Sequence, residues 1–107
     1  MTRLSYREAF ERPAGFDPHA LGAAQLQQRL IAHGIHPPEG LSAVESGDAD
    51  FWLDLWMSHV VGPQLGVDAP QFIYDFPASQ SALSRIRPGT PPLAERFELF
   101  WRGVELA

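Results

Sequence analysis

The order of hydrophobic and polar positions divides the 107 residues of the chain into two parts. In residues 1–62, apolar side chains recur every three or four positions, which is the spacing of one helix face. In residues 70–107, aromatic and β-branched residues alternate with polar ones between proline-rich turns, which is typical of strands. These two patterns predict one α+β unit, in which short helices pack on part of an antiparallel sheet.

Two helices are expected before residue 35. Ser5 and Glu8 fit a capping box, and the helix that follows should end within residues 13–15, which contain a proline and a glycine. Asp17, followed by a proline, is a second start signal, because proline is tolerated in the first turn of a helix. The apolar positions that follow keep helical spacing until Gly34, which predicts the end of the second helix.

A third helix is expected after a proline-containing loop at residues 36–40. Asp48 can cap this helix, and Gly62, which is followed by a proline, should end it. Its apolar residues form one stripe, which comprises Phe51, Trp52, Leu55, Trp56 and Val60. Because such a stripe is usually core, we assign the two tryptophans to the interior rather than to a binding face.

The second part of the chain is expected to contain a strand, a loop and a hairpin. Residues 71–76 (QFIYDF) are rich in aromatic and β-branched side chains and predict a strand. Residues 78–93 carry several prolines and predict a loop. Residues 94–106 alternate in character on either side of Arg102-Gly103, which predicts two strands joined by a two-residue turn.

The predicted hairpin brings two glutamates onto one face. Phe100 lies opposite Glu105, and Glu98 becomes a diagonal neighbour of Glu105. Diagonal Cα atoms are roughly 7–8 Å apart, so two carboxylates can converge on one Mg²⁺ ion. Arg96 and Arg102 share this face, so a ladder of surface ion pairs accounts for the same residues. Spacing alone permits the metal site but favours the ion pairs.

Composition and charge narrow the class of protein. The formal net charge is −5 and the 8 Lys and Arg residues are dispersed, so we expect no nucleic-acid binding by this chain. There are no cysteines, which excludes disulfides, thiolate metal sites and cysteine nucleophiles. No apolar run approaches the ~20 residues that cross a bilayer, and no secretory leader is recognised, so we expect a cytoplasmic protein without membrane contact.

Residues 96–107 (RFELFWRGVELA) resemble the strand, turn and strand that precede motif 3 in lysyl-type class II aminoacyl-tRNA synthetases. The resemblance implies an internal piece of such a catalytic domain, in which Glu98 and Glu105 bind the Mg²⁺ ions of ATP. It also implies that the motif 2 and motif 3 arginines are missing, and no residue here is assigned as catalytic. Because adenylate formation depends on positioning and charge stabilisation, we expect the isolated chain to be inactive in ATP–pyrophosphate exchange.

A second stretch resembles the same family, and its sequence differs between two branches of that family. Residues 72–83 (FIYDFPASQSAL) are similar to the strand and loop that enter the amino-acid pocket. The resemblance therefore implies that Phe76, Ala78, Ser79 and Gln80 lie near that pocket. Lysyl-tRNA synthetases typically carry a glutamate where Ser79 stands. The sequence FPASQ is instead typical of short paralogues that attach lysine, as (R)-β-lysine, to a lysine of elongation factor P.

Three functions follow from the resemblance. The first is an ATP- and Mg²⁺-dependent ligase, expected as a homo-oligomer, that adenylates lysine or β-lysine and transfers it to elongation factor P. The second is a lysyl-tRNA synthetase, which charges tRNA-Lys with lysine. The third, of another class, is a non-catalytic interaction module derived from a synthetase, which would pair through the open edge of the last hairpin.

Other polar residues receive structural interpretations. His33 and His36 have no third ligand nearby and are expected in a solvated loop. His59 lies at the end of the third helix, where a cation suits the helix dipole. Ser79 has no histidine base beside it, so it is not assigned as a nucleophile. Asp75 could contact substrate or end its strand with a hydrogen bond, and both alternatives stay open.

Overall fold

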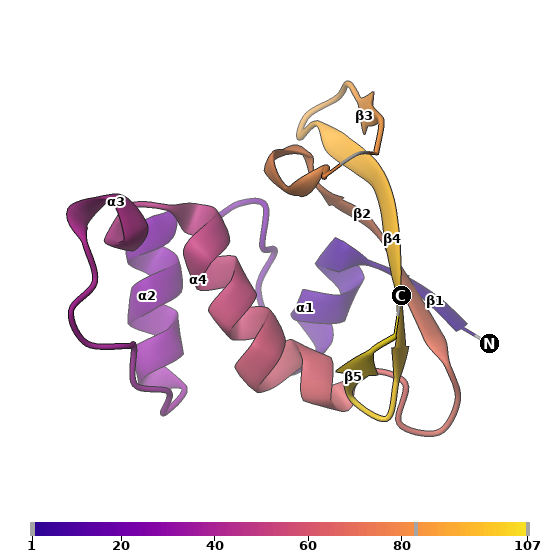
Figure 1. The fold of residues 1–107 in the computed structure, drawn as a ribbon, viewed down its shortest axis with the longest axis horizontal. Coiled ribbons are helices and arrows are strands. Elements are labelled where there is room, and N and C mark those ends of the chain that lie inside the picture. The colour runs from indigo at the N-terminus through magenta and orange to yellow at the C-terminus, as the bar shows by residue number, and fades with distance from the viewer. Residues whose placement is uncertain (1, 83, 107) are drawn as a thin grey trace.

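The computed structural model describes residues 2–82 and 84–106 (Figure 1). Its helices are α1 (Tyr6–Ala14), α2 (Ala23–Ala32), α3 (Ala43–Ser46) and α4 (Ala49–Trp56), and α4 continues as a π-helical turn, η1 (Met57–Val61), and a 3-10 turn, η2 (Gly62–Gln64). Its strands are β1 (Thr2–Ser5), β2 (Gln71–Pro77), β3 (Ile86–Arg87), β4 (Leu93–Trp101) and β5 (Val104–Glu105), and a further 3-10 turn, η3 (Ala78–Gln80), follows β2. The predicted α+β class is confirmed.

The sheet is mixed rather than purely antiparallel. Its order is β1-β2-β4-β3, and β5 also pairs with β4. β1 runs parallel to β2, whereas β2, β3 and β5 are antiparallel to β4. The prediction that residues 1–62 are helical is therefore wrong at β1, because a short strand that pairs with distant residues has no periodic pattern of its own. The single loop predicted over residues 78–93 is wrong at η3 and β3.

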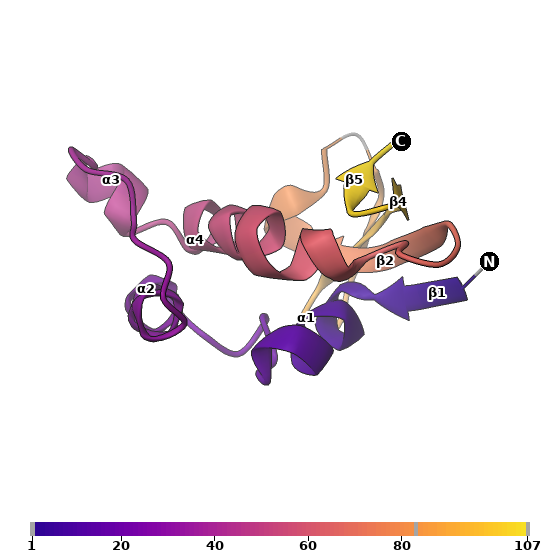
Figure 2. The same ribbon diagram turned by 90° about the horizontal axis from the view of Figure 1, so that it is seen from below.

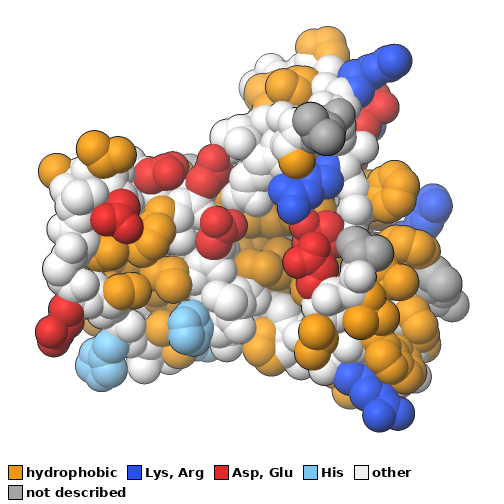
Figure 3. Space-filling model, in the orientation of Figure 1, with side chains coloured by type: hydrophobic (Ala, Val, Ile, Leu, Met, Phe, Trp, Pro, Cys, Tyr) orange, Lys and Arg blue, Asp and Glu red, His pale blue; other side chains and the backbone are white. Residues whose placement is uncertain are grey.

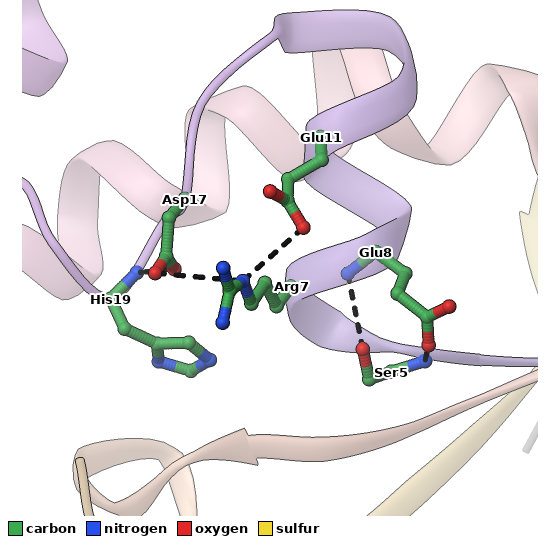
Figure 4. Close-up of polar contacts among 6 residues, drawn as sticks. All are labelled: Ser5, Arg7, Glu8, Glu11, Asp17 and His19. Atoms are coloured by element: carbon green, nitrogen blue, oxygen red, sulfur yellow. Dashed lines mark hydrogen bonds and ion pairs between the residues drawn. The ribbon is translucent and has the colours of Figure 1, made fainter. Parts of the chain in front are cut away.

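The capping box predicted at the start of α1 is confirmed. Ser5 Oγ accepts a hydrogen bond from the Glu8 N–H, and Glu8 Oε1 accepts one from the Ser5 N–H, each at 3.1 Å (Figure 4). The helix ends where Gly15 adopts the left-handed conformation, with φ at 81°. Both ends of α1 are thus set by local residues, as the sequence indicates.

Asp17 forms a turn instead of starting a helix. Its carboxylate accepts the His19 N–H at 2.9 Å, and its carbonyl accepts the Ala20 N–H at 3.1 Å. Arg7 of α1 also forms an ion pair with this carboxylate at 3.6 Å (Figure 4). Because these bonds close a local turn, α2 begins only at Ala23 and the predicted helix start is wrong.

The third predicted helix is confirmed with two differences. Asp48 caps α4, since its carboxylate accepts the Asp50 N–H at 3.0 Å. α3, which the sequence pattern did not predict, precedes it with its own capping box of Ser42 and Glu45. Helical structure also continues through η2 instead of ending at residue 62, because the proline of η2 occupies its first turn. No helix in the described residues is long and apolar enough to span a membrane.

An aromatic core joins the helices to one face of the sheet, here called the inner face. Trp52 and Trp56 are 0% and 1% exposed, which confirms their assignment to the core. Trp56 Nε1 donates to the Leu26 carbonyl of α2 at 3.0 Å. Tyr6 of α1 packs on Phe76 of β2, with ring centroids 4.9 Å apart. Figures 1 and 2 accordingly show α1 against β1 and β2, with α4 running from α2 past α1 toward the sheet.

The β4–β5 hairpin is supported by the loop that follows η2. Its predicted register is confirmed, with Phe100 opposite Glu105. Arg102 and Gly103 have φ values of 52° and 77°, as a type I′ turn requires. The Arg102 N–H donates to the Gly66 carbonyl at 2.7 Å, so the turn is bonded to this loop. The position of Glu105 therefore depends on the loop as well as on β4.

Replacing Gly66 with alanine is expected to destabilise the chain by about 2–3 kcal/mol and to displace the hairpin. Gly66 has a φ of 63°, and an added Cβ would lie 2.4 Å from the Phe100 carbonyl oxygen. Gly15→Ala is the matched control, because φ is 81° but nothing lies within 4 Å of its added Cβ. Urea unfolding measures both variants. Equal losses at the two positions would contradict the close approach of this loop to the hairpin.

Candidate functional site

A cleft of about 670 Å³ opens between α4 with its continuation and the inner face of the sheet. Figure 3 shows this hollow, with acidic side chains around it and hydrophobic ones at its floor. The residues that line it are Tyr6, Asp50, Asp54, Met57, Ser58, Gly62, Phe76, Ser79, Gln80, Arg96, Glu98, Phe100, Gly103, Val104 and Glu105. Both predicted glutamates and three of the four predicted loop residues are among them. The fourth, Ala78, lines a smaller hollow of about 300 Å³.

Glu98 and Glu105 face each other in the cleft. Glu105 is held opposite Phe100, two residues beyond Glu98, so both carboxylates lie on the inner face. Glu98 is only 8% exposed, whereas Glu105 lies at the open rim. Burial raises the pKa of Glu98, the Arg96 guanidinium opposes this effect, and the Glu105 carboxylate adds to it. Two facing carboxylates of this kind are stabilised by a cation that they share.

The predicted ladder of surface ion pairs forms at Arg96. Its Nη2 donates to the Glu98 carboxylate, and its Nη1 donates to the Gln80 carbonyl at 2.8 Å. Arg102, by contrast, lies over the Trp101 ring with its guanidinium carbon 5.1 Å from the centroid. The two arginines of the predicted ladder therefore have different partners, and Arg96 belongs to the cleft.

The loop after β2 is held from the helical side by Asp50. This residue lies in the first turn of α4, and its Oδ1 accepts hydrogen bonds from Ser79 Oγ at 2.9 Å and from Gln80 Nε2 at 3.2 Å. Phe76, at the entrance of the loop, is buried and packs on Tyr6. One carboxylate thus positions two of the predicted pocket residues at once.

The wall of the cleft that α4 provides was not predicted from the sequence. Asp50 and Asp54 are four residues apart and so share one helix face, a spacing that could have identified them as a pair. Burial raises the pKa of Asp54, and the nearby Asp50 adds to it. Burial also raises the pKa of Tyr6, whose hydroxyl interacts with Gln80. Their contact with the loop after β2 could not have been predicted, because it joins residues that are far apart in the sequence.

The acidic pair fits one kind of metal ion. Among residues 2–82 and 84–106, no group of three or more His, Cys, Asp or Glu side chains could hold a metal by itself. Glu98 and Glu105 can therefore hold only an ion that takes its other ligands from substrate and water. Mg²⁺ bound through one or two carboxylates and substrate phosphates has this coordination, whereas a structural zinc ion does not.

Asp75 lies away from the cleft. It has a φ of 56°, at the irregularity where the pairing of β2 with β4 shifts register. Its carboxylate forms an ion pair with Arg87 of β3 at 2.8 Å. It lines a separate hollow of about 330 Å³. This contact is also a hydrogen bond, in which Arg87 Nη2 donates to Asp75 Oδ1, but it does not end the strand, because β2 continues to Pro77. His33 and His36 are exposed, as predicted.

Curated proteins that match nearly the whole chain are ligases. Each of them is named elongation factor P–(R)-β-lysine ligase. The chain is 39% identical to the protein from Sodalis glossinidius over 104 residues, 38% identical to that from Vibrio cholerae over 105, and 40% identical to that from Klebsiella pneumoniae over 104. The predicted resemblance to this branch is confirmed.

The matches cover nearly all of the chain but only a small part of each relative. They span 97% of the chain for the Sodalis and Klebsiella proteins and 98% for the Vibrio protein, but 31% of each relative. The chain thus spans about a third of the length of the curated relatives it matches. No family model matches the chain.

Proposed function

We propose that the chain forms part of an ATP-dependent ligase that adenylates lysine or β-lysine and transfers it to a lysine of elongation factor P. The observation that carries the proposal is the cleft, because the FPASQ loop and the Glu98–Glu105 pair line the same cavity. The names of the relatives support the amino acid and the protein acceptor. Adenylation requires ATP and the amino acid side by side, and one shared cavity suits that requirement.

In this proposal the FPASQ loop lies beside the bound amino acid. The polar groups of Ser79 and Gln80 are held by hydrogen bonds to Asp50, so they need little rearrangement when a ligand enters. The electrostatic field of the cleft favours a cationic ligand such as an ammonium group. The charged residues on its lining are four acids and one base: Asp50, Asp54, Glu98, Glu105 and Arg96.

Glu98 and Glu105 would hold Mg²⁺ together with the phosphates of ATP and water. When bound, the ion neutralises the charge that develops on the phosphates. The residues of the chain supply negative charge at fixed positions, since Glu98 is anchored in β4 and Glu105 in the hairpin. The loop that carries Gly66 supports the hairpin, so it positions the second carboxylate.

The fold supports a finer assignment, which is also a proposal. Residues 70–107 would belong to the core sheet of a class II synthetase-type catalytic domain, and residues 1–62 would be an insertion-like part packed on it. A homo-oligomer in the cytoplasm is the expected state of the whole protein. The order of the two resembling stretches along the chain supports this assignment.

The test is ATP–pyrophosphate exchange by the complete product of the reading frame that contains the chain. Lysine and (R)-β-lysine are supplied separately, and transfer of labelled amino acid to elongation factor P and to tRNA-Lys is then measured. We expect exchange, with transfer to elongation factor P, and no exchange by the 107-residue chain alone. Transfer to tRNA-Lys only would establish a lysyl-tRNA synthetase instead. Absence of exchange with both amino acids would favour a non-catalytic interaction module.

A further inference from the structure

Arg96, on β4, contacts both halves of the cleft. Its guanidinium donates to the Gln80 carbonyl at 2.8 Å and to the Glu98 carboxylate. The same group lies over the Phe76 ring, 4.7 Å from the centroid. One planar group therefore holds the backbone of the FPASQ loop and one member of the acidic pair at the same time, which the fork of an arginine allows.

The loop has a second, independent anchor on its other side. Asp50 of α4 holds the side chains of Ser79 and Gln80, whereas Arg96 holds the Gln80 backbone. The side chains of the loop are thus fixed by the helical part and its backbone by the sheet. Arg96 and Asp50 thus hold different groups of the same loop.

Arg96 is also the partner that balances the charge of Glu98. The side chain of Glu98 is 10% exposed and that of Arg96 is 31% exposed, so water screens this ion pair less than a surface pair. A divalent cation shared by Glu98 and Glu105 would take over the role of counterion and would repel the guanidinium. The hydrogen bond from Arg96 to the Gln80 carbonyl would remain.

From this geometry we infer that Arg96 is a positioning residue that couples occupancy of the acidic pair to the position of the FPASQ loop. The inference rests on the proposed function and adds a linkage between its two halves. A cation at Glu98 and Glu105 releases Arg96 from Glu98, so the guanidinium aligns with the Gln80 carbonyl, to which it already donates, and holds the loop more firmly. The amino acid therefore binds more tightly beside a metal–nucleotide complex, by about 5-fold or more, and the effect on nucleotide affinity is reciprocal.

The first test follows the amide resonances of the ¹⁵N-labelled 107-residue chain during titration with Mg²⁺. We expect the amides of Glu98 and Glu105 to shift, and those of Ser79 and Gln80 to shift with the same midpoint. In Arg96→Lys the glutamates still respond but the loop does not, because an ammonium keeps the charge without the fork that spans two acceptors.

Two further variants make the comparison independent of folding defects. Arg87→Lys is the matched control, because Arg87 pairs with Asp75 in a different hollow, and both responses should remain. Arg96→Gln carries an amide, which reaches fewer acceptors than a guanidinium. This variant is used in place of Arg96→Lys if Arg96→Lys fails to fold. A loop response of normal size in either folded Arg96 variant would overturn the coupling.

The outcomes separate this inference from the proposed function. If Glu98 and Glu105 respond to Mg²⁺ neither in the chain nor in the complete protein with a non-hydrolysable ATP analogue, the metal site itself is wrong and the coupling falls with it. If they respond while the loop does not, the metal site stands and the coupling is wrong. In the complete protein, the matching measurement is lysine affinity with and without a non-hydrolysable Mg²⁺–ATP analogue. The gain of about 5-fold should disappear in Arg96→Lys, and an undiminished gain would overturn the inference.

Discussion

Replacing Trp56 with alanine is expected to leave the chain largely unfolded. Removing a buried indole costs about 3–5 kcal/mol. That loss reaches the lower end of the stability of a whole domain, about 5–15 kcal/mol, and small domains lie toward this end. Trp56 is 1% exposed, meets the Phe16 ring edge-on at 5.0 Å and donates to the Leu26 carbonyl. It therefore joins α4 to α2 and to the segment between α1 and α2.

Trp101 supplies the matched control for this variant. It is the same residue type but only partly buried, and its ring contacts the exposed Arg102. We expect Trp101→Ala to cost less than about 1.5 kcal/mol, because less apolar area returns to water. Urea unfolding followed by circular dichroism compares the two variants. A loss at Trp56 no greater than that at Trp101 would show that the contact between α2 and α4 does not hold the fold together.

The elements predicted correctly are those whose cause is local. The hairpin needs only an alternating pattern and the dipeptide Arg102-Gly103, and both are visible within residues 94–106. The start of α1 needs only the reciprocal bonds of Ser5 and Glu8. In each case the stabilising partners lie within a few residues of one another. A sequence pattern therefore contains the whole interaction.

The elements that were predicted wrongly are of two kinds. In one, a residue can form either of two local structures, and in the other, the element depends on a partner far away in the sequence. Asp17 can cap a helix or close a turn, and its bonds to the next residues select the turn. β1 has a strand conformation because residues 71–74 lie beside it. α3 had a recognisable signal, since Ser42 and Glu45 form a capping box like that of α1. That helix could have been predicted from the same rule.

The candidate site shows the same division. Glu98 and Glu105 were predicted as neighbours because a hairpin joins them through a short turn. Asp50 was not predicted, since its hydrogen bonds to Ser79 and Gln80 span 29 and 30 residues. The bond from Arg96 to the loop spans 16 residues and was likewise not predicted. The distance between two residues along the sequence predicts a contact between them only when both belong to one local unit, such as a hairpin.

In the complete protein, replacing Glu98 with glutamine is expected to remove most of the proposed ligase activity without weakening the fold. The amide has nearly the same shape but no negative charge, so it cannot share Mg²⁺ with Glu105. Removing one preorganised electrostatic group from an active site typically lowers kcat by about 10²–10³-fold. Glu95→Gln is the matched control, because Glu95 is exposed and does not line the cleft.

In Glu98→Gln, the free energy of unfolding should stay the same or rise, although the activity falls. Burial raises the pKa of Glu98 above its value in the unfolded chain. Such a group favours folding fully only below its unfolded pKa, and this contribution is lost as the pH rises through the folded pKa. At neutral pH the ionised Glu98 therefore costs stability, and the neutral amide avoids this cost. Glu98→Gln should thus unfold at the same urea concentration as the parent chain or at a higher one.

The Mg²⁺ dependence of the two glutamate variants shows whether a loss of activity comes from loss of the metal site. If the two glutamates share the ion, Glu105→Gln should raise the Mg²⁺ concentration needed for half-maximal exchange, and Glu98→Gln should raise it further because Glu98 is the buried member of the pair. If both variants keep the parent activity and the parent Mg²⁺ dependence, Glu98 is an ordinary ion-pair partner of Arg96. The interpretation as ion pairs, which the spacing alone favours, would then be the correct one.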